Sequence, residues 1–372
     1  MPAENQTYEP GTHPSLPPPR STVGVVGWLR GNLFSSWSNT LFTFLALYLL
    51  YKLIPPVIDW VFLSADFQGE SRDDCTSGGA CWVFIKTRFD QFMYGFYPQA
   101  ERWRVNLMFG LFIALLIPMF IDSFRHKAWV GALILFVFPF VAYALLYGGY
   151  FGLMKVETSL WGGLSLTLII AIVGMVGSFP LGVLLALGRR SKMPAISSVC
   201  TAFIELWRGV PLITVLFMSS VMFPLFLPEG VHFDKLVRAL IGVMLFSSAY
   251  MAEVVRGGLQ AIPKGQYEGA MSLGLNYWQT MGFIVLPQAL KIVIPGIVST
   301  FIGLFKDTTL VLIIGLFDFL GIVQAASTDP KWLGYAVEGY VFCAVVYWMF
   351  CFSMSRYSMT VERKLETGHK AK

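Results

Sequence analysis

The stretch at residues 159–187 reads SLWGGLSLTLIIAIVGMVGSFPLGVLLAL and contains no charged side chain. A helix that crosses the hydrocarbon core of a bilayer needs about 20 mostly apolar residues, so this stretch is long enough to be a transmembrane helix. Further stretches of the same kind lie on both sides of it, some with a proline or glycine break. The eight predicted spans are roughly 39–63, 105–121, 130–147, 159–187, 209–227, 237–255, 288–306 and 337–354.

The composition of the chain agrees with this pattern. Of 372 residues, 56% are hydrophobic and 13% are charged, whereas soluble domains carry about 25% charged residues. A soluble globule would lack the polar residues needed to cover its surface. This excludes a soluble enzyme, a nucleic-acid-binding protein and a disordered scaffold. We therefore expect an all-α polytopic membrane protein with about eight transmembrane helices in a lipid bilayer.

The segment 309–327 is apolar as well, but it contains Gly315, Asp318 and Gly321. Residues of this kind are tolerated at membrane depth where the backbone is buried in protein or lines a cavity. The pattern therefore predicts a short interfacial or re-entrant helix and not a ninth span.

The distribution of Lys and Arg predicts the orientation, because these residues are enriched in cytoplasmic loops. Eight spans put both termini on one side, which then receives sixteen of the 27 Lys and Arg residues. Ten fall on the other side, half of them in the long loop 64–104, and Lys52 lies within the first span. We expect both termini in the cytoplasm and the loop 64–104 outside it.

The first 38 residues form a polar leader before the first span. Its prolines, which are typical of an extended, disordered segment, are Pro2, Pro10, Pro14, Pro17, Pro18 and Pro19. Residues 361–372 are expected to form a cytoplasmic tail.

The five cysteines do not make a disulfide framework. Cys200, Cys343 and Cys351 fall in or beside spans and are expected to be small buried residues. Cys75 and Cys81 flank a flexible turn in the outer loop, where a disulfide is plausible if the loop faces an oxidising compartment. Their spacing alone leaves this pairing open.

The sequence carries no catalytic constellation. The four histidines, His13, His126, His232 and His369, all fall in tails or loops, so no span holds a histidine metal ligand or general base. No Walker A loop occurs, so the chain cannot bind ATP in that way. We expect a non-catalytic transporter or channel subunit with no metal and no cofactor.

The loop between the sixth and seventh predicted spans has the pattern of a helical hairpin. Pro263 can begin a first helix over 264–273, and Gly274 tolerates the left-handed conformation that ends a helix. Asn276 can cap a second helix that ends before Pro287. The side chains expected to form an apolar ridge are Tyr267, Ala270, Met271, Tyr277, Trp278, Met281 and Ile284. Such a ridge indicates a partner with a matching groove.

This hairpin resembles the EAA loop of ABC-importer permeases. The matching run is Glu268-x-Ala270-x3-Gly274-x9-Ile284-x-Leu286-Pro287, with Gly269 where the family usually has Ala. Three further runs resemble the polar-amino-acid branch of that family. They are Arg256-Gly-Gly-x-Gln260-x-Ile-Pro263-x-Gly265-Gln266, Trp207-Arg208-Gly209-Val210-Pro211 and Lys306-Asp307-Thr308-Thr309-Leu310.

The resemblance covers residues 155–360, which implies that the last five spans form a type I ABC-importer permease core. The three spans and outer loop before it, at 39–154, resemble the accessory part of the larger M permease of general L-amino-acid (Aap/Bzt-type) systems. The family implies a bacterial inner-membrane location and L-amino-acid substrates. It further implies a homologous second permease, two ATP-binding subunits and a periplasmic amino-acid-binding protein. The residues that would couple to the ATPase are Gln266, Glu268, Gly269, Ala270, Gly274, Ile284, Leu286 and Pro287.

Charged residues near the ends of spans are candidates for the transport path. Lys306, Asp307 and Thr308 are candidate path residues, since a zwitterionic amino acid needs both charge signs along its route and membrane charges tend to line such routes. The alternative is a pair that only anchors the span at the interface. Candidate residues of the cytoplasmic mouth are Arg208, Glu253 and Arg256. For these the alternative is simple i,i+3 ion pairs, Arg208 with Glu205 and Arg256 with Glu253.

The sequence thus predicts the transmembrane permease subunit of an ATP-driven amino-acid importer. The alternative from another class is an ion-coupled secondary amino-acid transporter, which has no need of an exposed docking ridge. A membrane-embedded enzyme fails for lack of any nucleophile–base pair or metal set.

Overall fold

A computed structural model describes residues 24–121, 123–150, 152–228, 230 and 233–366. Within these residues the ordered chain is helical, and extended segments meet only in isolated bridges. Among the described residues, seven helices are long and apolar enough to cross a membrane, or eight if the bent pair α8 and α9 is one span. The expected all-α polytopic fold is confirmed. Parts of the predicted leader (1–23) and tail (367–372) lie outside the described residues, as do His13, His232 and His369.

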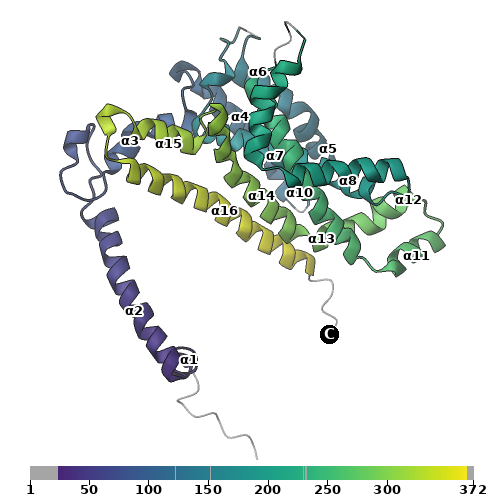
Figure 1. The fold of residues 1–372 in the computed structure, drawn as a ribbon, viewed down its shortest axis with the longest axis horizontal. Helices are drawn as coiled ribbons and strands as arrows, with labels where there is room; N and C mark the ends of the chain where they lie inside the picture. The colour runs from purple at the N-terminus through teal and green to yellow at the C-terminus, as the bar shows by residue number, and fades with distance from the viewer. Residues whose placement is uncertain (1–23, 122, 151, 229, 231–232, 367–372) are drawn as a thin grey trace, which may run out of the picture. The chain divides into compact units, whose positions relative to one another are not determined.

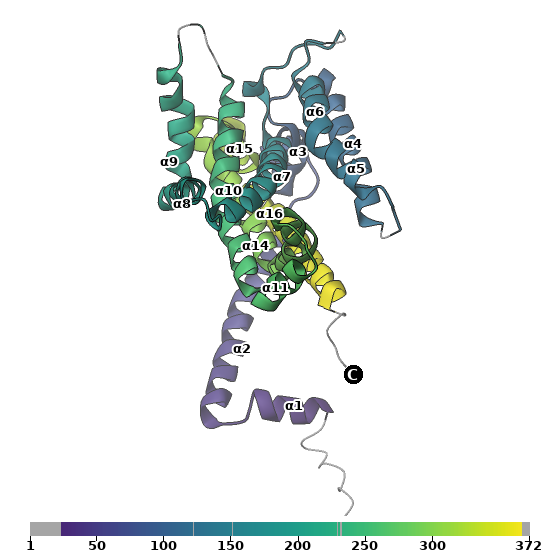
Figure 2. The same cartoon turned by 90° about the vertical axis from the view of Figure 1, so that its right-hand side faces the viewer.

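The chain divides into two compact units, one of residues 1–69 and 73–81 and one of residues 70–72 and 82–372. The first unit contains a short helix α1 (Gly24–Asn32) and the first predicted span, α2 (Trp37–Ile58), which continues as a π-helical turn η1 (Asp59–Leu63). Figure 2 shows α1 lying across the end of α2. The predicted span 39–63 is therefore confirmed, at Trp37–Leu63.

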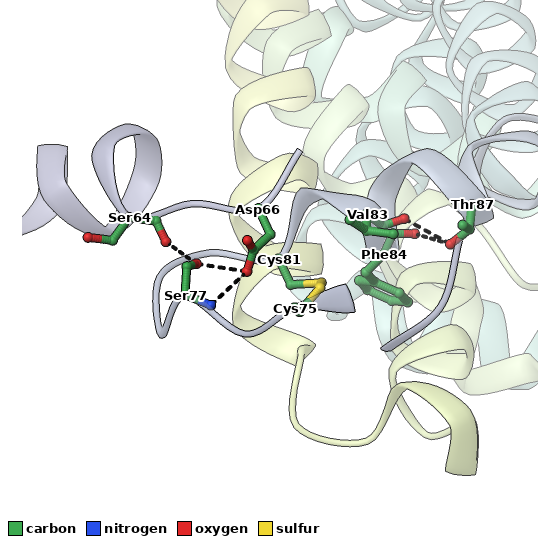
Figure 3. Close-up of a disulfide and its surroundings, with 8 residues drawn as sticks. All are labelled: Ser64, Asp66, Cys75, Ser77, Cys81, Val83, Phe84 and Thr87. Atoms are coloured by element: carbon green, nitrogen blue, oxygen red, sulfur yellow. Dashed lines mark hydrogen bonds between the residues drawn. A yellow bond between two sulfur atoms is a disulfide. The ribbon is translucent and has the colours of Figure 1, made fainter. Parts of the chain in front are cut away.

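A disulfide joins Cys75 to Cys81 in the loop of this unit that follows η1, with the two Cα atoms 5.6 Å apart. Beside it, Asp66 accepts hydrogen bonds from the hydroxyl of Ser77 at 2.7 Å and from its backbone N–H at 3.1 Å (Figure 3). These hydrogen bonds hold the pKa of the Asp66 carboxyl below its ordinary value. The pairing that the sequence left open is present.

The second unit begins with a helix that the sequence did not predict, α3 (Trp82–Tyr94), within the supposed loop 64–104. Val83, Phe84, Ile85 and Phe92 are buried in it, and it packs against α7, α15 and α16. Charged residues interrupt its apolar face, so this segment is not a continuous apolar run and was not predicted as a span. The second and third predicted spans follow, as α4 (Arg102–Phe120) and as the continuous helix α5 (Lys127–Ala132), η4 (Leu133–Val137) and α6 (Phe138–Tyr147).

The centre of this unit is the pair α7 (Gly163–Arg189) and α10 (Lys235–Ala261), which lie side by side in Figures 1 and 2. Glycines of α7 allow the close approach. A Cβ on Gly177 would lie 2.3 Å from the sulfur of Met244, and one on Gly182 would lie 2.6 Å from Cβ of Met251. Small residues at membrane helix interfaces serve this purpose, because packing and not the hydrophobic effect holds such helices together.

The fifth predicted span, 209–227, begins later than expected. Helix α8 (Pro194–Gly209) is followed by a bend of 102° and then by α9 (Leu212–Phe217), η6 (Met218–Met222) and η7 (Phe223–Phe226). Val210 and Pro211 are both extended at this bend, since a residue before proline is disfavoured in the helical region. The helical segment that corresponds to the predicted span therefore starts after Pro211, at Leu212.

The seventh predicted span, 288–306, is shifted in the structure to Ile294–Ile314. It consists of α14 (Ile294–Asp307) and a 3₁₀ segment η9 (Thr308–Ile314), and α13 (Leu286–Ile292) is a separate short helix before it. Pro295 starts α14, which explains the break at Val293. Residues 309–314 of the predicted short helix 309–327 thus belong to this span, and only α15 (Phe319–Ser327) is separate.

The last predicted span, 337–354, is part of the longer helix α16 (Ala336–Glu366). The remaining elements are short: η2 (Arg72–Asp74), η3 (Gln99–Glu101), η5 (Thr158–Leu160), α11 (Lys264–Ser272), α12 (Tyr277–Gln279), η8 (Thr280–Val285) and η10 (Pro330–Trp332).

Candidate functional site

The hairpin between α10 and α14 forms as the sequence predicts at its turn. Helix α11 follows Pro263, and Gly274 is left-handed with φ +76°. Asn276 begins the second arm in a capping box, in which its side chain accepts from the N–H of Gln279 and the Gln279 side chain accepts from the N–H of Asn276. Asn276 and Gln279 therefore fix the angle at which the second arm leaves the turn.

The second arm does not end before Pro287 as expected. The chain runs from α12 through the π-helical turn η8 directly into α13, with Pro287 in the first turn of α13. A proline is tolerated there because the N–H groups of a first turn have no partner within their own helix. The hairpin is therefore connected by continuous helix to the base of the seventh span.

The exposed ridge of the hairpin differs in part from the predicted one. Ala270 and Met281 are buried, and Tyr267 is half-buried, so these three side chains face the protein. The large apolar side chains that are exposed are Met271, Leu273, Tyr277, Trp278 and Phe283. Gln266, Glu268, Gly269, Gly274 and Pro287 are exposed as well, whereas Ile284 and Leu286 are half-buried. A hairpin of about 20 residues thus presents an apolar surface of aromatic and long side chains.

Two sets of contacts attach α11 to the rest of the unit. The Arg190 guanidinium, just after α7, donates to the Leu259 carbonyl at 2.8 Å and to the Tyr267 hydroxyl at 3.2 Å. The Gln288 amide of α13 donates to the Gln266 side chain at 3.1 Å. Helix α11 is therefore tied to α7, α10 and α13.

A cluster of charges joins α7, α8 and α10 near the same end of the unit. Glu253 is bound by Arg189, by Arg256 at 2.7 Å and by Arg208 at 3.9 Å. The expected pair of Arg256 with Glu253 is present. The expected partner of Arg208 is wrong, because Glu205 pairs instead with Arg189 at 2.9 Å. The arginines converge on one carboxylate from three helices, which local i,i+3 pairs cannot do.

A cavity of about 280 Å³ lies between α10 and α14, and it is lined by Phe246, Ser247, Tyr250, Thr300, Gly303, Leu304 and Asp307. Ser247 is 3% exposed, and its hydroxyl has no hydrogen-bond partner among the described residues. The Arg208 guanidinium lies over the Tyr250 ring, 5.7 Å from its centroid. The cavity thus combines a carboxylate, two aromatic rings and three hydroxyls, of which the one on Ser247 is unsatisfied. Buried polar groups without a partner are rare and need an explanation such as a ligand.

Of the three predicted path residues, only Asp307 lines this cavity. Lys306 is exposed and outside the lining, and the buried hydroxyl of Thr308 donates to the Phe305 carbonyl at 2.8 Å. Consecutive residues of a helix point in directions about 100° apart, so only one of three neighbours faces a given cavity.

Sequence reasoning missed Ser247, Tyr250, Thr300, Arg189 and Arg190 as site residues. Helical spacing was the available signal. Thr300, Gly303 and Asp307 recur at i, i+3 and i+7, and Tyr250 follows Ser247 at i+3, so each set lies on one helix face. The two arginines were counted only for orientation. No group of three or more metal-ligating side chains occurs among the described residues.

Comparison with known proteins identifies the class of this fold and site. Residues 178–367 match the family described as the inner membrane component of binding-protein-dependent transport systems, and the chain belongs to this family as an amino-acid permease. It is thus the permease subunit of an amino-acid ABC importer, a non-catalytic multi-pass protein of the inner membrane that works with ATPase partners. This decides against the ion-coupled carrier.

Two relatives match along nearly the whole chain. The inner membrane amino-acid ABC transporter permease protein YhdY of Escherichia coli is 57% identical over 96% of this chain and 97% of its own length. The glutamate/glutamine/aspartate/asparagine transport system permease protein BztC of Rhodobacter capsulatus is 40% identical over 95% of this chain and 96% of its own. A crystal structure of an amino acid ABC transporter with histidines has 28% identity and a TM-score of 0.48, over 54% of this chain and 92% of that one.

Proposed function

We propose that this chain forms half of the translocation path of its importer, pairing with a homologous second permease as a heterodimer. Substrate would be delivered by a periplasmic amino-acid-binding protein, and two ATP-binding subunits would drive transport. We further propose acidic amino acids and their amides as substrates. This is supported by the name of BztC, which assigns glutamate, glutamine, aspartate and asparagine to that relative.

The coupling element is the hairpin from α11 to η8. The observation that carries this proposal is its exposed apolar ridge. Leu273, at the end of α11, is 79% exposed, and Trp278, in the capped helix α12 after the turn, is 72% exposed. An amphipathic helix with such anchors fits a hydrophobic groove of a partner. We assign the exposed residues Gln266, Glu268 and Gly269 to the docking face, and Ala270, Ile284 and Leu286 to the inner face that supports it.

The substrate path passes the cavity that holds Asp307. Every amino acid carries an α-ammonium group, for which a carboxylate and the free hydroxyl of Ser247 are suitable partners. Lys306 and Thr308 have structural roles in the span. Lys306 is exposed at the end of α14, and the Thr308 hydroxyl donates a hydrogen bond to the backbone. The cluster around Glu253 forms the cytoplasmic mouth below this cavity, linked to it because Arg208 contacts both Glu253 and Tyr250.

The proposed orientation puts both termini in the cytoplasm and the loop 64–104 in the periplasm. The Lys and Arg bias supports this, and so does the Cys75–Cys81 disulfide, since disulfides persist in oxidising compartments. We keep 39–154 as an accessory part and 155–360 as the permease core, a division close to the family match at 178–367.

One experiment tests these partners and substrates together. The transporter is solubilised from its native membrane, captured through a tag on this chain, and every co-purifying subunit is identified by mass spectrometry. We expect a second permease, an ATP-binding subunit and, with glutamine added, a binding protein. Recovery of two copies of this chain without a second permease would contradict the heterodimer. Uptake of basic amino acids in preference to glutamate and glutamine would contradict the substrate class.

A further inference from the structure

The contact between Arg190 and the hairpin joins three elements at one point. Arg190 follows the last residue of α7, Leu259 lies in the last turn of α10, and Tyr267 lies in α11. Besides the two hydrogen bonds given above, the Arg190 guanidinium lies over the Tyr267 ring, 5.8 Å from its centroid. The Tyr267 hydroxyl in turn donates to the Leu259 carbonyl at 3.3 Å. We call this set of three residues the Arg190 joint.

The chemistry of the joint explains why an arginine is suited to it. The last four carbonyls of a helix have no partner within the helix, and the carbonyl of Leu259 is one of these in α10. A cation is favoured at this end of a helix. A planar guanidinium can in addition stack on an aromatic ring while it donates hydrogen bonds. Lysine has the same charge, but its ammonium group can neither stack on the ring as a plane nor donate two hydrogen bonds in a fixed geometry.

The joint lies on an apolar cluster that connects the hairpin to the two central helices. Tyr267 packs against a cluster of buried side chains. The cluster includes Ala186 of α7, Val255 and Leu259 of α10, and the inward-facing Met281 and Val285 of the hairpin. Close-packed apolar contacts resist compression, but they are not directional and fix the relative orientation of the helices only weakly. The polar contacts of the joint supply that register, since they require Tyr267 to keep its position relative to both helix ends.

We propose that Arg190 is a positioning residue that transmits the movement of the hairpin to α7 and α10. This rests on the proposed docking of the hairpin to an ATPase subunit. When the hairpin moves, the joint makes the ends of α7 and α10 follow α11, so that the cavity at Asp307 changes access. Without Arg190 the hairpin keeps only its non-directional apolar contacts with these helices, and ATP hydrolysis is less tightly coupled to import.

The test uses the complete transporter in proteoliposomes with its binding protein and L-glutamine. The variants are Arg190→Ala, Arg190→Lys and Tyr267→Phe. The matched control is Lys192→Ala, which removes an exposed cation two residues further along the chain. For each, three quantities are measured: the amount of bound ATPase subunit, the basal rate of ATP hydrolysis, and the number of glutamine molecules imported per ATP hydrolysed.

We expect Arg190→Ala to keep its ATPase subunits and basal hydrolysis. Its import per ATP should fall severalfold, because ATP hydrolysis would continue while the ends of α7 and α10 no longer follow the hairpin. Tyr267→Phe, which keeps the ring, should show a smaller fall, Arg190→Lys should lie between the two, and Lys192→Ala should match the wild type. The Lys and Phe variants keep the test decisive if the alanine variant does not assemble.

The proposal is overturned if all three joint variants import as much glutamine per ATP as the wild type. It is also overturned if they lose their ATPase subunits in step with import, since Arg190 would then act in docking. Failure of the underlying docking proposal has a different signature: Trp278→Glu in the ridge would retain bound ATPase subunits.

Discussion

At the scale of single residues, the proposed substrate path through the cavity between α10 and α14 predicts that the charge of Asp307 matters for substrate. Replacing it by Asn keeps the shape and removes the charge. We expect the apparent affinity for neutral amino acids to fall about tenfold, the loss expected for one charge-assisted hydrogen bond. Glutamate and aspartate should lose less, because the repulsion of their side chain disappears too, and basic amino acids should lose most.

Competition uptake with the three classes of amino acid, normalised to protein in the membrane, measures this difference. The matched control is Lys306→Gln, which alters the neighbouring charge outside the cavity lining and should affect all classes alike or not at all. A uniform loss across classes for Asp307→Asn would show that Asp307 only anchors its span.

Glu253 is the residue on which the charge cluster depends. Its side chain is 16% exposed and meets three arginines, whereas Glu205 is 56% exposed and meets one. Replacing Glu253 by Gln leaves the arginines without their shared negative charge and should destabilise the protein by about 1–3 kcal/mol. The same change at Glu205, an exposed pair, should cost less than about 1 kcal/mol.

Thermal unfolding in detergent, followed by tryptophan fluorescence, compares the two variants. The midpoint should fall clearly further for Glu253→Gln than for Glu205→Gln, and the gap should widen at high salt, because salt screens the exposed Glu205 pair more than the partly buried pairs of Glu253. Equal midpoints for the two variants would mean that the convergence of arginines on Glu253 adds nothing to the stability of the protein.

At the scale of elements, the turn of the hairpin depends on the left-handed conformation of Gly274. With φ at +76°, a β-branched residue there is strongly disfavoured. We expect Gly274→Val to leave the protein inserted but to abolish substrate-stimulated ATP hydrolysis, since the second arm would leave the turn in another direction. Glu268→Lys, which reverses a charge on the docking face, should have the same effect.

The control for these variants is Gly265→Ala. Gly265 lies within α11 but is not assigned to the docking face, and nothing lies within 4 Å of a Cβ added to it. This change should stabilise the helix by up to about 1 kcal/mol and leave stimulated hydrolysis intact. The assignment of the hairpin to coupling would be untenable if Gly274→Val and Glu268→Lys hydrolysed ATP like the wild type in proteoliposomes.

The same elements show what could be predicted from sequence. The length of the apolar segments located the spans, because a lipid-facing helix can be recognised from its composition alone. It did not locate α3, because charged residues interrupt the apolar face of that helix. It also did not locate the bend at Val210 and Pro211, where α8 and α9 meet at 102°. The hairpin was predictable at Gly274 and Asn276 because turns and caps are local. The convergence of Arg189, Arg208 and Arg256 on Glu253 was not, since it depends on how three helices pack.

At the scale of the whole molecule, the proposed division separates an accessory part from the permease core. The prolines of the leader and its polar composition favour a segment that contributes no packed structure. We expect removal of residues 1–23, which precede α1, to leave uptake close to normal. Normal abundance in the membrane together with a loss of uptake would assign the leader a working role.

The central claim is that the hairpin binds the ATP-binding subunit of the importer, and site-specific photo-cross-linking tests it directly. A benzophenone amino acid is placed at Trp278, 72% exposed in the hairpin, and separately at Leu225, 80% exposed in η7. After irradiation of membranes that contain the whole transporter, adducts are identified by mass spectrometry. We predict an adduct with the ATP-binding subunit from position 278 and none from position 225. Equal adducts from both positions, or none from position 278 while the subunits co-purify, would contradict the claim.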